Sequence, residues 1–333
     1  IIHAAGIHPM RLFGTRSAIA HADAHLQAYS CSLVRGVLEE ALAGRLEYLD
    51  GAVFPHTCDS IQRLSDIWRL NLKFSFHSDV VLPVKLDTAS ARQYMADVLR
   101  KFRRELEMGL GLGITDAQLS KSIKTFNTIK RALGKIYRLR SANPGLIAGA
   151  DVYALVKSAM IMDRAEAAEK LTAFAAELEA VKDAKPGSGK RIVVSGGLCD
   201  HADIYSIIEK SGGAVVWDDL CTGSRYFEGL VSEDGDPIEA LADRYTGRVV
   251  CPAKHSSITA RGENIVSIAK EHRASGVIFL LLKFCDPHSF DYPYMKEMLD
   301  GAGVPSMLME IEQDLPSEGQ LSTRFEAFIE MLR

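Results

Sequence analysis

Short apolar runs and longer stretches with an apolar residue at every third or fourth position follow one another along this chain. The runs are typical of buried parallel strands, and the longer period is typical of helices with one buried face. In the first 112 residues the pattern predicts strands at 8–13, 52–54 and 80–86 and helices at 31–42, 59–70 and 88–108. Strands that alternate with helices in this way indicate a doubly wound, mostly parallel sheet.

The middle of the chain has a different pattern, with helix after helix from residue 115 to residue 184. The Pro-Gly-Ser-Gly stretch at 185–190 is typical of a linker. Alternation then resumes, with strands predicted at 191–195, 214–217, 248–251, 276–282 and 304–309 and helices at 202–210, 261–274, 291–301 and 318–332. We therefore predict an α/β protein with two doubly wound, Rossmann- or flavodoxin-like domains, at 1–112 and 190–333, joined by a helical segment at 113–184 and the linker at 185–190.

The composition narrows the class of protein. Hydrophobic residues make up 47% and charged residues 25% of the 333 positions, and a net charge of -4 without a long basic run argues against nucleic acid as a partner. The longest apolar runs have about seven residues, against roughly 20 for a membrane-spanning helix. Six cysteines in a chain of this length favour a reduced, cytoplasmic protein over a disulfide scaffold. No signal peptide is visible, and without a starting Met we expect further residues before Ile1.

Three cysteines occupy similar places in the predicted pattern. Cys31 opens a predicted helix, Cys58 follows one predicted strand and precedes a helix, and Cys285 follows another strand. Ligands bind at the carboxyl ends of strands in open α/β sheets, and a helix amino terminus favours the thiolate that metals need. Isolated cysteines are also common as small buried hydrophobes, so metal binding and packing both stay open on spacing alone. For Cys251 packing is the favoured interpretation. Cys199 and Cys221 can each line the same crevice, but a structural role is favoured over ligation for both.

Other polar residues also lie where strands end. His56, His255 and Ser256 are candidate proton donors, although single residues of these types more often hydrogen-bond loops. The pair Asp218-Asp219 can bind Mg²⁺, but a solvated strand end is the favoured interpretation. The turn at 195–197 can approach a phosphate, but it lacks the full dinucleotide fingerprint, so we predict a tight turn there.

The order of several motifs carries a family resemblance over essentially the whole chain. The motifs are Ala4-Ala-Gly6, Tyr29-Ser-Cys31, Phe54-Pro-His-Thr-Cys-Asp59, Asp218-Asp-Leu-Cys-Thr-Gly-Ser-Arg225, Lys283-Phe-Cys-Asp286 and Gln320-Leu-Ser-Thr-Arg-Phe-Glu-Ala-Phe328. Together they resemble the 2-hydroxyacyl-CoA dehydratase and benzoyl-CoA reductase family, and in particular its D-component type of iron–sulfur subunit. The resemblance implies a [4Fe-4S] cluster held by Cys31, Cys58 and Cys285.

The resemblance also implies partners and chemistry. It implies a paralogous iron–sulfur subunit, a separate ATP-hydrolysing iron–sulfur activator that delivers one electron at very low potential, and an acyl-CoA substrate. In the dehydratases the electron makes a ketyl radical from the thioester carbonyl, and in the aromatic reductases it begins ring reduction.

Three other functions stay open at this point. The chain can be a subunit that only relays electrons, or a related reductase of small molecules that bears a larger fused cluster. It can also be an α/β protein that holds no cluster and keeps its cysteines for packing.

Overall fold

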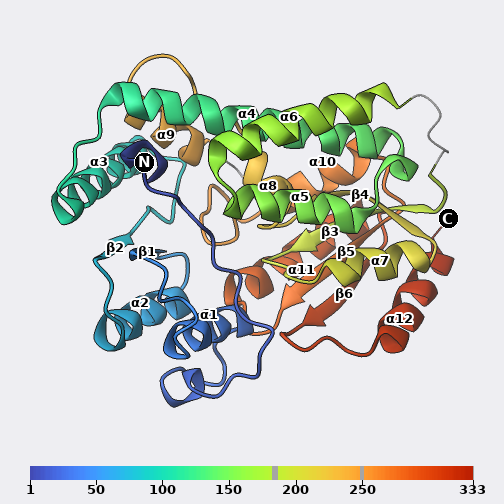
Figure 1. Cartoon of the computed structure of the whole chain (residues 1–333). Coiled ribbons are helices and arrows are strands. Elements are labelled where there is room, and N and C mark those ends of the chain that lie inside the picture. The colour runs from blue at the N-terminus through green and yellow to red at the C-terminus, as the bar shows by residue number, and fades with distance from the viewer. Residues whose placement is uncertain (182–186, 248–250, 333) are drawn as a thin grey trace. The chain divides into compact units, whose positions relative to one another are not determined.

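The computed structural model describes residues 1–181, 187–247 and 251–332, which divide into two compact units, each built from three separate stretches of chain (Figure 1). Unit 1 consists of Ile1–Lys124, Val231–Ile258 and Lys283–Pro287. Unit 2 consists of Thr125–Leu230, Thr259–Leu282 and His288–Arg333. The domain boundaries expected at residues 112, 184 and 190 stay predictions.

Unit 1 is built on a two-stranded parallel sheet, in which β1 (Gly51–Pro55) pairs with β2 (Phe76–Val80) (Figure 1). Its other elements are η1 (His3–Ala5), η2 (Ala22–Ala24), α1 (Ser32–Leu42), α2 (Asp59–Asn71), α3 (Ala89–Leu110), α9 (Pro237–Thr246) and the start of α4 (Asp116–Ala142). The Thr88 side chain accepts a hydrogen bond from the Ala91 N–H and so begins α3, and Gly111, in the left-handed region, ends it. Between these caps Met95, Leu99 and Leu106 fall at helical spacing and enter the core of unit 1.

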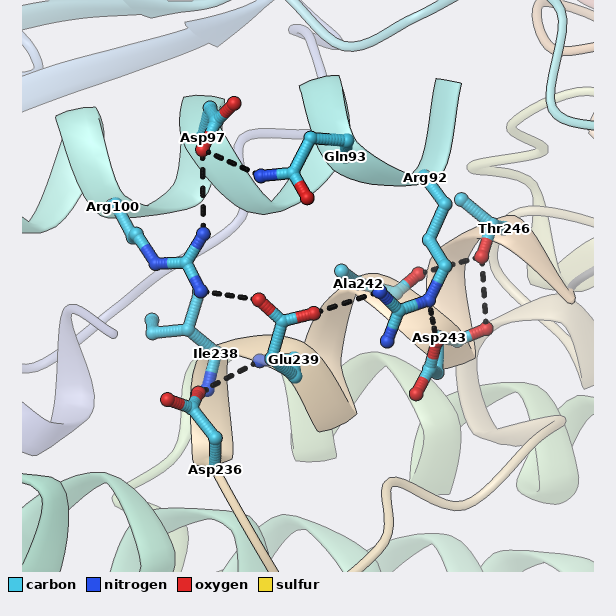
Figure 2. Close-up of polar contacts among 10 residues, drawn as sticks. All are labelled: Arg92, Gln93, Asp97, Arg100, Asp236, Ile238, Glu239, Ala242, Asp243 and Thr246. Carbon is cyan, nitrogen blue, oxygen red and sulfur yellow. Dashed lines mark hydrogen bonds and ion pairs between the residues drawn. The ribbon is translucent and has the colours of Figure 1, made fainter. Parts of the chain in front are cut away.

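The stretch that contains α9 joins unit 1 through contacts with α3, which Figure 2 shows. Arg92 and Arg100 on α3 both pair with Glu239 on α9, and Arg92 also pairs with Asp243. Asp236 begins α9 by accepting hydrogen bonds from the backbone N–H groups of Ile238 (2.8 Å) and Glu239 (2.9 Å). Beneath these polar contacts Ile238 is buried in the same apolar cluster as α3, which fixes the position of α9 by burial as well as by charge.

Unit 2 contains a four-stranded parallel sheet with the strand order β4-β3-β5-β6. The strands are β3 (Lys190–Gly196), β4 (Gly213–Asp219), β5 (Gly276–Leu282) and β6 (Ser306–Ile311). All seven residues of β5 are buried, as expected for the centre of a parallel sheet. The helices are η3 (Pro144–Leu146), α5 (Gly149–Ile161), α6 (Arg164–Ala180), α7 (Ala202–Lys210), α8 (Ser224–Phe227), α10 (Ala260–Glu271), α11 (Asp286–Gly301) and α12 (Glu318–Met331), with the rest of α4. Alternate residues such as Val193 and Phe279 bury one face of the sheet with α10 and α11.

The α/β class and the parallel sheets are confirmed, but some predicted elements are wrong. Residues 8–13 form no strand, because an apolar run becomes a strand only where it joins a sheet, and neither sheet of the described residues includes this segment. The strand predicted at 80–86 instead ends at Val80, and Pro83, which has no N–H, follows. The last helix before β6 begins at Asp286 rather than 291, and it contains Pro293 in its interior.

Helix α9 was not predicted at all. The strand predicted at 248–251 and the linker predicted at 185–190 lie partly outside the described residues, since 248–250 and 185–186 are not described. Over the described part of the chain, no helix combines the length and apolar character that a membrane crossing requires.

Candidate functional site

Two of the three predicted ligand cysteines stand at the amino ends of helices in unit 1. Cys31 is the N-cap residue of α1 and Cys58 is the N-cap residue of α2, and both have an extended backbone. Because the first N–H groups of a helix have no partner within the helix, they favour negative charge beside them. The local sequence explains both placements, since each cysteine directly precedes a stretch with helical apolar spacing.

The electrostatics of the two thiols indicate that they lie near one another. Burial, with a smaller contribution from Cys58, raises the pKa of the Cys31 thiol to about 11, although a hydrogen bond from the backbone N–H of Val34 acts to lower it. Burial also raises the pKa of Cys58, with additional repulsion from Asp59 and from Asp286. Both thiols are therefore held in surroundings where the isolated anion is disfavoured and a cation would stabilise it.

Cys285 belongs to unit 1 as well, in the short stretch Lys283–Pro287. It follows β5 and directly precedes Asp286, the residue whose charge acts on Cys58. The described residues contain no group of three His, Cys, Asp or Glu side chains that is already arranged to hold a metal ion. The assignment of Cys31, Cys58 and Cys285 as a ligand set therefore stays a prediction.

The other three cysteines have different surroundings. Cys199, in unit 2, is 1% exposed, its pKa is raised to about 12 by burial, and its backbone N–H and C=O are both hydrogen-bonded by the Thr222 hydroxyl. Cys221 donates its N–H to the carbonyl of Gly197. Cys251, in unit 1, forms an isolated bridge with Lys254.

His56 takes part in a hydrogen-bonded chain that the sequence did not indicate. Its Nε2 lies 2.9 Å from Oδ1 of Asp79, which also accepts a 2.5 Å hydrogen bond from the Ser65 hydroxyl. The same hydroxyl lies 3.0 Å from Nε2 of His77. His77 and Asp79 lie on β2 two positions apart and line a groove of about 600 Å³ beside α3. Their alternate spacing on one strand is the signal that could have drawn attention to them.

The other two candidate proton donors have different positions. His255 donates its backbone N–H to Val84 (2.7 Å) and accepts from the Leu86 N–H (2.9 Å), and its side chain is exposed. Ser256 is half-buried. The structure does not bring either of them together with Cys31 or Cys58 through any contact described for these residues.

In unit 2 the carboxyl ends of β3 and β4 are filled by a buried polar network. Asp219, 2% exposed, accepts 3.0 Å hydrogen bonds from Ser195 and Arg261 and forms a 3.1 Å ion pair with Arg225. Asp218 accepts a 2.7 Å hydrogen bond from Tyr137, and burial raises its pKa to about 6. The prediction that Asp218 and Asp219 form a solvated strand end is therefore wrong, because both carboxyl groups are buried and hydrogen-bonded.

The glycine pair at the end of β3 is closely packed against neighbouring segments. A Cβ on Gly196 would lie 2.0 Å from the carbonyl oxygen of Leu280, and one on Gly197 would lie 3.3 Å from the His288 ring. Both glycines permit this close packing. The tight turn predicted at 195–197 is wrong, because Ser195 and Gly196 continue β3 and the chain bends only at Gly197.

Comparison with known proteins gives a consistent set of relatives. A family model described as 2-hydroxyglutaryl-CoA dehydratase, D-component, matches residues 1–332. The chain is 30% identical over 332 residues to the (R)-phenyllactyl-CoA dehydratase beta subunit of Clostridium sporogenes, covering 100% of this chain and 88% of that protein. It is 28% identical over 340 residues to the lactoyl-CoA dehydratase beta subunit of Anaerotignum propionicum, with 100% and 88% covered. It is also 30% identical over 313 residues to a benzoyl-CoA reductase subunit of Thauera aromatica, with 92% and 80% covered.

Proposed function

Because the chain belongs to the 2-hydroxyglutaryl-CoA dehydratase D-component family and is an enzyme subunit, we propose that it holds a [4Fe-4S] cluster through Cys31, Cys58 and Cys285. The enzyme would use low-potential, single-electron chemistry on a CoA thioester, either to dehydrate a 2-hydroxyacyl-CoA or to reduce an aromatic acyl-CoA. The relatives are all named as subunits, which supports a partner in the same enzyme, and we propose that this partner is a paralogous iron–sulfur protein. An ATP-hydrolysing iron–sulfur activator would supply the electron.

The observation that carries this proposal is that Cys31 and Cys58 are the N-cap residues of two helices in the unit that also contains Cys285. All of these residues belong to unit 1, although 227 positions separate Cys58 from Cys285 in the sequence. Thiols are the usual ligands of iron–sulfur clusters, and a raised thiol pKa is the expected state of such ligands before a cation offsets their charge. The donor set therefore fits the chemistry of the proposed group.

The residues of this chain have distinct tasks in the proposed site. A bound [4Fe-4S] cluster supplies one-electron chemistry at low potential. The thiolates of Cys31, Cys58 and Cys285 would hold it, and the backbone N–H groups of Val34 and Ile61 would stabilise the negative charge of the first two. His56, held at Nε2 by Asp79, is the proposed proton-holding group that is nearest in sequence to Cys58.

The test is the iron and sulfide content of the protein after anaerobic purification with its partner, together with an electron paramagnetic resonance spectrum. Cys58→Ser should lose most of the bound iron and all turnover, since a serine hydroxyl is a harder and poorer ligand than a thiolate. Cys31→Ser and Cys285→Ser should behave in the same way.

Cys251→Ser is the matched control, because Cys251 is in the same unit and is half-buried like Cys58. It should keep its iron. Equal iron loss from folded Cys58→Ser and Cys251→Ser variants would disprove the ligand assignment. Soaking with an acyl-CoA then separates a substrate-binding subunit from one that only relays electrons, because a relay subunit should show no thioester beside its cluster.

A further inference from the structure

The two-stranded sheet of unit 1 has one edge that opens into a groove. In the part of the chain that the structure describes, β2 pairs only with β1, and the Phe76 N–H donates to the Asp50 carbonyl (3.2 Å) just before β1. Backbone groups of successive residues in a strand point to opposite edges, so those of His77 and Asp79 point away from β1. These two residues of β2 therefore present N–H and C=O groups to which no other described strand binds.

The groove of about 600 Å³ runs along this free edge. It is lined by residues 75–79 and by four residues of α3. On the α3 side, Glu105 accepts a 2.8 Å hydrogen bond from the Ser78 hydroxyl, and a Cβ on Gly109 would lie 2.8 Å from the Phe76 ring. Ser78 and Phe76 thus face α3, and the alternate residues of β2 face the other way, so a groove that both sets line follows the edge between them.

The ionisable side chains that line the groove already have partners within the protein. The Ser65 hydroxyl donates to Asp79 (2.5 Å) and lies 3.0 Å from Nε2 of His77, and Glu105 forms a 3.1 Å ion pair with Lys101. The main-chain groups of the edge are what the groove has left to bind a ligand. Their natural partner is another extended backbone, which would lie about 4.8 Å from β2 as a further strand.

We infer that this groove receives an extended segment of the partner subunit, which adds a third strand to the sheet through the free N–H and C=O groups of β2. Another chain is the expected source of the segment, because the relatives are all named as subunits. The inference rests on the partner subunit of the proposed function and does not depend on the proposed cluster.

The lining of the groove also defines the segment that it would bind. A charged side chain would have to displace an ion pair or a hydrogen bond of the lining, so the segment should be uncharged. Met108 lines the groove and is 78% exposed, and the neighbouring Gly109 packs against Phe76, so the end of the groove beside Phe76 is apolar. One apolar residue of the segment should cover Met108 there.

Hydrogen exchange tests the inference on the unchanged protein. In the chain without its partner, the amides of His77 and Asp79 should exchange about tenfold faster or more than those of Ser78 and Val80, which by the same alternation face β1. In the complex with the copurified partner, the first pair should slow about tenfold or more and the second pair should not change. Mass spectrometry with electron-transfer fragmentation resolves the four amides, so the alternation along β2 is the internal control.

A matched pair of substitutions tests the apolar end of the groove. Met108→Lys should weaken binding of the partner about fivefold or more in isothermal titration calorimetry, because it places an ammonium group where an apolar contact is expected. Leu70→Lys is the control, since Leu70 is also 78% exposed on a helix of unit 1 but does not line the groove, and it should leave the affinity unchanged. Because both side chains are exposed, neither change should lower the midpoint of thermal unfolding of the chain alone.

Several results would overturn the inference. They are slow exchange of His77 and Asp79 in the chain alone, fast exchange of both in the complex, the absence of a copurified partner, and equal affinities of Met108→Lys and Leu70→Lys. Slowing that depends on the concentration of the chain alone would make the occupant a second copy of this chain and would also overturn it. Iron content is a separate measurement: protection in an iron-free complex would uphold the inference and refute the cluster, whereas bound iron without protection would do the reverse.

Discussion

The two units both place polar groups at the carboxyl ends of parallel strands, but they satisfy those groups in opposite ways. In unit 2 Asp219 is surrounded by Ser195, Arg225 and Arg261, all of them at most 5% exposed. In unit 1 the chain leaves β1 and reaches Cys58, whose thiol pKa is raised by burial and by neighbouring carboxylates. At the end of β4, arginines of the protein itself neutralise the buried carboxylate. After β1, the contacts described for Cys58 include no cation that would offset the charge of its thiolate.

The difference teaches that topology alone does not identify a ligand site. Parallel strand ends are where ligands bind in α/β sheets, and both units have such ends. A network of buried ion pairs disfavours ligand binding, because a ligand would have to break interactions whose loss is costly in an interior without water. Buried thiols with raised pKa values gain from a bound cation. The comparison therefore favours unit 1 as the functional region.

Asp219→Ala should have the largest effect on stability. It would leave Arg225 and Arg261 buried without their shared carboxylate and should lower the free energy of unfolding by about 3–5 kcal/mol. Urea unfolding followed by circular dichroism measures the loss. Asp291→Ala is the control, since Arg261 would keep Asp219 and the Asp291 side chain is 15% exposed, so its loss should be clearly smaller. Equal effects would mean that the network is not centred on Asp219.

Glu39→Gln tests how unit 1 holds the segment that leads to Cys31. Burial opposes ionisation of Glu39, but hydrogen bonds from His21 and from the backbone N–H groups of Ala22 and Ala20 outweigh it and lower its pKa to about 2. At pH 7 the substitution should lower the free energy of unfolding by about 1–3 kcal/mol, because its hydrogen-bond donors, among them the buried Ala22 N–H, lose a charged acceptor.

The pH dependence of Glu39→Gln has a defined sign. The folded pKa lies below the ordinary value of 4.5, so the stabilisation is complete above pH 4.5 and is lost as the pH falls toward 2. The difference in free energy of unfolding between the unchanged protein and Glu39→Gln, measured by urea titration, should therefore become smaller over that range. Glu40→Gln, which affects a partly exposed ion pair with Arg45 and a hydrogen bond with Thr15, is the control and should change stability much less. A difference in free energy of unfolding that stays constant from pH 7 to about pH 2.5 would contradict the lowered pKa of Glu39.

Glu239→Gln should have the smallest effect. Glu239 pairs with Arg92 and Arg100 across α3 and α9, where all three side chains are 28–41% exposed (Figure 2). Exposed pairs contribute about 0.2–1 kcal/mol, and salt screens them. The difference in urea midpoint should be small in dilute buffer and should vanish near about 1 M NaCl. If Glu239→Gln lowered the free energy of unfolding as much as Asp219→Ala, exposed and buried charges would not differ in their contribution to the stability of this protein.

Local patterns in the sequence were sufficient for the α/β class and for part of the candidate site. The helices after Cys31 and Cys58 begin where the apolar spacing and Asp59-Ser60 predict, because capping and one buried face act over a single turn or two. The motif order also identified the family, which the match over residues 1–332 confirms. The roles of Cys31, Cys58 and Cys285 as ligands stay predictions.

Tertiary structure alone decided the rest. The sequence did not predict that 231–258 belongs with unit 1, because α9 meets α3 across about 140 positions through Ile238 and Glu239. Nor did it predict that Asp219 is buried, since an aspartate at a strand end is solvated unless distant arginines reach it. A residue's own neighbours determine helix starts and apolar faces, whereas partners of buried charge and of sheet edges come from segments that only the folded chain brings together.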